Sequence, residues 1–129
     1  MKTKFRIRLL TPNDQTEDQN SEWIRLSNDT DPLAMEENLR LFSRIELEFV
    51  HASDSQAYGQ ALLLRRRLRF RGDLRAVGEI ATDQLMQLQG AGFSSVVLRD
   101  GTDTADVILQ LESLLSSFDA DASTEHVSW

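Results

Sequence analysis

The chain has 129 residues, 40% of them hydrophobic and 27% charged, which is enough for one core and argues against two domains. It has no cysteine and two histidines, which excludes disulfides, thiolate nucleophiles and iron–sulfur ligation and makes structural zinc or a histidine-rich metal site unexpected. The net charge of −7 disfavours nucleic-acid binding, but residues 61–75 carry six arginines and one aspartate, whereas residues 76–129 carry one arginine and nine acidic residues.

The first elements along the chain are two short strand candidates. Apolar residues alternate with cations over residues 5–9, and a second apolar stretch covers residues 23–26 after a polar turn. We expect these two strands to pair with each other as antiparallel edge strands. The longest apolar run, residues 61–64, is too short to cross a membrane, and the N-terminus lacks the pattern of a secretory signal, so we expect a cytoplasmic protein with no membrane partner.

A helix and a strand follow. Asp31 can cap a helix that has Pro32 in its first position and an apolar stripe up to residue 42. Over residues 45–49 apolar residues alternate with two glutamates, which predicts a strand whose glutamate face must reach solvent or cations.

The arginine-rich segment is expected on a helix. Caps are available at residues 53–55, and alanines and leucines recur at spacings of three and four from Ala57 to Leu68. The arginines then occupy the distal half of this helix, and Gly72 is placed to end it.

The last elements alternate strand and helix. Strands are predicted over residues 74–77 and 95–98, with a helix between them that ends at Gly90 or Gly92, and a final helix runs from residue 102 or 103 to 118. This order favours a parallel sheet. The predicted fold is a single compact α/β domain over residues 1–129, with a mostly parallel sheet of about 4–5 strands flanked by helices and a flexible tail over 119–129.

Three segments could carry function. The arginine-rich segment is either a solvated charged face or a site for an anion or an acidic partner, because arginine binds carboxylates and oxyanions through paired hydrogen bonds. The turn over residues 77–84 lies where ligands bind in open α/β sheets, or it simply reverses the chain and caps the next helix. It has no glycine-rich nucleotide-binding motif.

The third segment contains His51, Asp54 and Ser55 within five residues, but nothing in the pattern supplies an oxyanion hole or a nucleophile elbow. His51 is interpreted as a loop residue and Tyr58 as a packed ring whose hydroxyl finds a partner. No catalytic residue, metal ligand or cofactor is therefore predicted.

The stretch from Ala61 to Phe93 resembles the bacterial domain of unknown function 934 family. The residues that carry the resemblance are Ala61-x-Leu63-Leu64-Arg65-x-Arg67-Leu68, Phe70-Arg71-Gly72-x-Leu74-Arg75-Ala76-Val77-Gly78, Asp83-Gln84-Leu85 and Gly92-Phe93. The similarity covers about residues 45–118. It departs from the family pattern at residues 55, 56 and 59, at Glu79, where the family usually has aspartate, and at Arg69, where it usually has glycine.

The resemblance implies an α/β protein associated with assimilatory sulfite reduction and with a sulfite or nitrite reductase haemoprotein, under the description of a putative oxidoreductase subunit. Our first hypothesis is a non-catalytic accessory protein that docks on the reductase or holds a small oxyanion. The alternatives are a small enzyme with Asp54 or Asp83 as base and Tyr58 as acid, and a self-associating scaffold or homo-oligomer. The candidate binding residues, which we expect to group near one edge of the domain, are Asp54, Tyr58, Arg65, Arg75, Gly78, Asp83 and Gln84. Arg67 and Arg71 also belong to the family-like pattern, and Arg66 and Arg69 are interpreted as surface charge.

Overall fold

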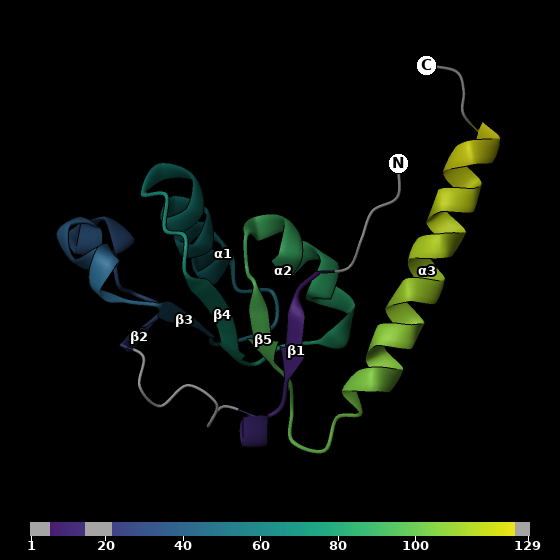
Figure 1. Ribbon diagram of the computed structural model, residues 1–129, viewed down its shortest axis with the longest axis horizontal. Coiled ribbons are helices and arrows are strands. Elements are labelled where there is room, and N and C mark those ends of the chain that lie inside the picture. Colours follow the sequence, from purple (N-terminus) through teal and green to yellow (C-terminus); the bar gives the residue numbers. More distant parts are fainter. Residues whose placement is uncertain (1–5, 15–21, 126–129) are drawn as a thin grey trace.

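A five-stranded, entirely parallel sheet forms the centre of the molecule (Figure 1). The structure is a computed structural model that describes residues 6–14 and 22–125, with side chains described as far as residue 116. The strands lie in the order β1-β5-β4-β3-β2. Their bounds are β1 Arg8–Leu10, β2 Trp23–Leu26, β3 Arg44–Phe49, β4 Asp73–Gly78 and β5 Ser95–Val97. The expected single α/β domain with a parallel sheet is confirmed.

The expected antiparallel pairing of the first two strands is wrong. Strand β1 pairs in parallel with β5 at one edge of the sheet, whereas β2 pairs in parallel with β3 at the other edge. The polar stretch between them, read as a turn from the sequence, is about a dozen residues long, which is the length that a parallel crossover needs and far more than a hairpin uses. Part of this connection, residues 15–21, lies outside the described residues.

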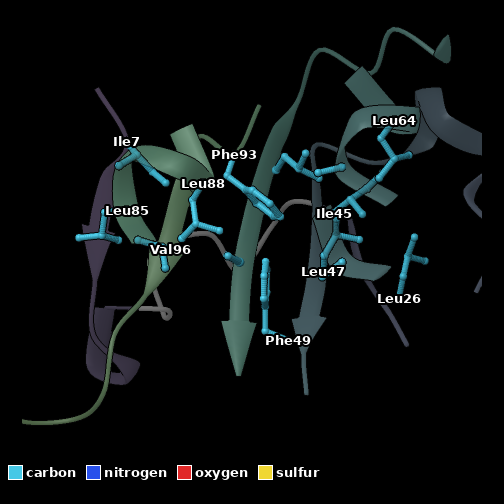
Figure 2. Packing of buried hydrophobic residues seen from close by; sticks show 14 of the residues in the cluster. Ile7, Leu26, Ile45, Leu47, Phe49, Leu64, Leu85, Leu88, Phe93 and Val96 are labelled. Carbon is cyan, nitrogen blue, oxygen red and sulfur yellow. The ribbon is translucent and has the colours of Figure 1, made fainter. Parts of the chain in front are cut away.

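The helices pack on one face of the sheet. Each strand from β3 to β5 lies next to the strand that precedes it in the chain, always in the same direction across the sheet. Because such crossovers are right-handed, the helices that they contain lie on the same face of the sheet. The core cluster accordingly joins Ile45, Leu47 and Phe49 of β3 to Leu64 and Leu88 from the helical layer (Figure 2). The opposite face of the sheet carries the alternate residues, which are mostly polar.

The arginine-rich segment begins as a helix and ends earlier than predicted. Helix α1 covers Ser55–Leu62, and a π-helical turn, η3, continues over Leu63–Arg67. The chain then leaves the helix, and Arg69 adopts a left-handed conformation with φ 59°. Gly72 is not a helix terminator: a Cβ there would lie 2.5 Å from the Ser43 carbonyl oxygen, so glycine is needed for close packing against the chain before β3.

The other predicted helices are present with changes at their ends. A 3-10 helix, η2, covers Pro32–Leu41 and is capped by Asp31 as expected. A short 3-10 turn, η4, spans Thr82–Gln84 and leads into α2, Leu85–Ala91, which ends at Gly92 with φ 108°. Helix α3, Thr104–Glu125, extends through residues 119–125 of the segment assigned to a tail, and residues 126–129 lie outside the described ones. None of the described helices is long and apolar enough to span a membrane.

The left-handed backbone at Arg69 gives a test of the fold. A non-glycine residue in this region is disfavoured by roughly 1–2 kcal/mol. Arg69→Gly is therefore expected to raise the free energy of unfolding by about 1 kcal/mol in urea titration. Arg71→Gly removes the same charge from an exposed position without positive φ, and it should give no gain. Equal effects of the two substitutions would contradict this account.

Candidate functional site

Asp54 lies in the loop between β3 and α1, and each oxygen of its carboxylate accepts two hydrogen bonds. One oxygen, Oδ2, accepts from the Val50 amide at 2.9 Å and from Asn28 Nδ2 at 2.8 Å, and Oδ1 accepts from the Gln56 and Ala57 amides. Burial pulls the pKa of Asp54 upward, but these four donors outweigh it and hold the pKa below its ordinary value. Asp54 is therefore an ionised cap that fixes the loop and the helix, as residues of this type do at helix N-termini.

Tyr58 and Gln84 join the two helices that follow β3 and β4. Gln84 Nε2 donates to the Tyr58 hydroxyl at 2.9 Å and to the Ala52 carbonyl at 2.8 Å, while its Oε1 accepts from the Ala81 amide at 2.7 Å. The Tyr58 ring packs edge-on against Phe49, with centroids 5.2 Å apart. Burial raises the pKa of Tyr58 despite the hydrogen bond from Gln84, so the phenol stays protonated at neutral pH.

Asp83 and Gly78 are also among the predicted site residues, and they lie in different hollows. The exposed Asp83 lines an open hollow of about 540 Å³ together with Tyr58 and Gln84. Gly78 lines another of about 320 Å³ with Glu79. Its φ of 100° and the clash that a Cβ would make with the Phe49 carbonyl oxygen explain why glycine ends β4.

Arg65 is at the opposite, amino end of the sheet. Its Nε donates to the Gly92 carbonyl at 2.7 Å, and Nη1 donates to the carbonyls of Phe70 at 2.9 Å and Gly72 at 2.8 Å. Burial lowers the pKa of Arg65, and the charge of Asp73 opposes that change. The guanidinium thus holds together the chain segments that enter β4 and β5.

Arg75 lies on the polar face of the sheet and is almost completely buried. Its Nη2 donates to Asp73 Oδ2 at 2.9 Å and its Nε to Ser95 Oγ at 2.9 Å. Asp73 also accepts from Ser94 and Ser95 through Oδ1. Burial would raise the pKa of Asp73, but the two hydroxyls, followed by the charges of Arg75 and Arg8, lower it below 3.8.

A second charged group lies beside the first on the same face. Glu46, fully buried, accepts from Arg25 through Oε1 at 2.8 Å and from Arg44 Nε through Oε2 at 3.0 Å. The Arg44 guanidinium also lies over the Trp23 ring, 4.7 Å from its centroid. The pattern over residues 45–49 predicts that the β3 glutamates reach solvent or cations, and Glu46 is paired with arginines. Arg44 and Asp73 were not among the residues predicted from the sequence. Charged residues alternate with apolar ones in both β3 and β4, and this pattern could have indicated that the charges pair across the two neighbouring strands.

The structure therefore divides the predicted site residues. Asp54, Tyr58 and Gln84 form one hydrogen-bonded region at the carboxyl edge, with Asp83 beside it and Gly78 on the neighbouring strand. Arg65 and Arg75 lie elsewhere and their donors are directed to protein acceptors. His51 is exposed, and its Nδ1 is 3.5 Å from Ser53 Oγ rather than near the Asp54 carboxylate. No group of three acidic or histidine side chains in the described part of the chain gathers as a metal site.

Five exposed arginines lie along one surface. Helix η2 meets η3 along a seam with a hollow of about 640 Å³ at one end and another of about 490 Å³ at the other. We call this surface the arginine seam. The cations that line it are Arg40, Arg66, Arg67, Arg69 and Arg71, and all five are exposed. Within the described residues none of them pairs with a carboxylate.

Fold and site together define a small parallel α/β domain with helices on one face of the sheet, a self-neutralised polar face and an exposed basic seam. The chain belongs to the family described as bacterial protein of unknown function (DUF934), whose model matches residues 23–129. Comparison with curated proteins and with solved structures found no match.

The charge pair on the polar face predicts a pH-dependent stability. Asp73→Asn removes the charge of Asp73 from beside the buried Arg75 and should lower the free energy of unfolding at pH 7 by about 2 kcal/mol. This is less than the roughly 3–5 kcal/mol for breaking a fully buried pair, because Asp73 is partly exposed and asparagine keeps one acceptor oxygen. Since the folded-state pKa is depressed, the stabilisation is present above pH 3.8 and is lost as pH falls through the lower folded-state value.

Urea titration between pH 7 and pH 2.5 measures this. The difference between the native chain and Asp73→Asn should shrink below about pH 4. Asp100→Asn, at an exposed turn, serves as the control and should differ little from the native chain at any pH. A constant difference across the pH range would show that Asp73 does not act through its charge.

Proposed function

We propose that this chain is a non-catalytic accessory protein that docks on an acidic protein surface through the arginine seam. The observation that carries the proposal is the division of the arginines. Arg65 and Arg75 direct their donors to acceptors inside the fold, whereas the five arginines of the seam are exposed and point no donor at a described carboxylate. Exposed guanidinium groups beside a groove are suited to carboxylates of a partner protein.

The docking form of the hypothesis has better support than the oxyanion form. An oxyanion held by Arg65 and Arg75 would have to compete with three backbone carbonyls in one case and with Asp73 and Ser95 in the other. The two guanidinium groups are also linked to the same carboxylate: Arg75 donates to Asp73 directly, and Arg65 reaches it through Ser94 Oγ. A small anion would therefore have to break the contacts that hold β4 and β5.

The enzymatic alternative has less support. A general base works best with a pKa near the working pH, whereas the pKa of Asp54 is lowered and both of its oxygens accept hydrogen bonds. Tyr58, the proposed acid, has a raised pKa and is bound to Gln84. These features support structural roles at the carboxyl edge.

The partner that we propose is a sulfite or nitrite reductase haemoprotein of assimilatory sulfite reduction, in the cytoplasm. This part of the proposal rests on the family resemblance carried by residues 61–93, and the seam supplies the mode of contact. Long-range attraction between a basic seam and an acidic surface would chiefly raise the rate of association and would weaken with salt.

The test is retention of the reductase haemoprotein by the tagged chain at low ionic strength. Arg66→Glu/Arg67→Glu is expected to reduce retention at least tenfold and to slow growth on sulfite as sole sulfur source. The matched control is Arg6→Glu/Arg99→Glu, which makes the same change of charge at exposed positions away from the seam and should retain the reductase. No enrichment of a reductase by the native chain, or equal loss in both variants, would contradict the proposal.

A further inference from the structure

Helix α3 is an acidic, partly apolar helix that extends from the body of the domain (Figure 1). Its 22 residues correspond to about 33 Å of helix. They contain five acidic residues and no lysine or arginine. Among its described side chains, Val107 and Leu111 in the first turns meet the core, whereas Leu109 is 65% exposed and Leu114 is 52% exposed. The helix therefore presents leucines and carboxylates that no described element covers.

The arginine seam has the complementary chemistry. Its two hollows contain exposed or half-buried leucines, among them Leu62 and Leu68, alongside the five arginines. Asp29, Asp31 and Glu36 also line the seam, which leaves two more positive than negative charges. Asp31 caps η2 and Asp29 accepts from Ser27, so two of these three carboxylates have hydrogen-bond donors within the fold. An acidic amphipathic helix can place leucines in the hollows and carboxylates on the arginines.

The two surfaces lie at opposite ends of the molecule. In Figure 1, α3 stands beyond β1 at one end of the longest axis, and η2 lies beyond β3 at the other. Val107 of α3 packs in the core, so α3 cannot reach the arginine seam of the same chain without breaking that contact. A second copy can supply the helix instead.

We infer that α3 of one copy docks in the arginine seam of a second copy. Two such contacts, related by a two-fold axis, close a dimer in which each copy gives its helix and receives the other. Pairing between two α3 helices is disfavoured because both are acidic and neither carries a cation to offset the repulsion. Opposite charges at the two ends favour the reciprocal arrangement.

This inference deepens the proposed function because it uses the same seam. An acidic partner protein and α3 would compete for the arginines, so the dimer would be the resting form and partner binding would release the helix. The two proposals can fail separately. Self-association is measured with the purified chain alone, whereas the docking proposal requires the reductase.

Sedimentation velocity of the full chain from 5 to 200 μM, in low salt and in 0.5 M NaCl, tests the inference. The native chain is expected to dimerise in low salt and to dissociate in high salt, since screening shortens the reach of the charges. Arg66→Glu/Arg67→Glu on the seam and Asp106→Arg/Glu112→Arg on the helix should each weaken dimerisation at least tenfold. An equimolar mixture of the two variants should recover a heterodimer, because the reversed seam then meets a reversed helix.

A second variant keeps the test independent of charge reversal. Leu109→Gln/Leu114→Gln replaces two exposed leucines, so it should fold normally by circular dichroism and still lose the dimer. Arg6→Glu/Arg99→Glu, with the same change in charge outside the seam, should dimerise like the native chain. A chain that is monomeric at all concentrations overturns the inference. A dimer that the leucine variant abolishes but the seam variant leaves intact also overturns it, since the helices would then pair with each other.

Discussion

The rest of the structure depends on how the charged residues on the helix-free face of the sheet are paired. All helices joined by the β2 to β5 crossovers lie on one side, so alternate residues of every strand must find another solution on the other side. The chain solves this with charge: Glu46 is placed between Arg25 and Arg44, and Asp73 beside Arg75. Buried charges are tolerated only when paired and hydrogen-bonded, so the register of neighbouring strands is fixed by these partners as well as by the core.

This constraint changes how the family-like residues are understood. Arg75, Gly78 and Gln84 stand in the stretch that carries the resemblance, and each has a structural task in the fold: neutralising Asp73, ending β4 against Phe49, and bridging Tyr58 to the chain before α2. Arg65 likewise closes the amino end of the sheet through backbone carbonyls. These residues of the family-like stretch therefore stabilise the fold. Residues that recognise a partner have to be sought among the side chains that the fold leaves exposed.

The arginine seam and α3 are two unlike exposed surfaces at the two ends of the domain. The seam between η2 and η3 is basic and contains leucines, and α3 is acidic and contains leucines. Neither surface requires a cofactor or a reactive group to bind another protein. Under the two proposals, their opposite charge would make self-association compete with the binding of an acidic partner.

Local chemistry determined most of the secondary structure from the sequence alone. The cap at Asp31, a cap within residues 53–55, the helix end at Gly90 or Gly92 and the alternation over residues 45–49 could be predicted because each depends only on residues close by in the sequence. The placement of β1 and β2 at opposite edges required the tertiary structure, because it depends on which strands meet across the sheet. The same holds for Arg65, Arg75 and the seam arginines, which are alike in sequence. Only packing decides which guanidinium groups face carbonyls or Asp73 inside the fold and which remain in solvent.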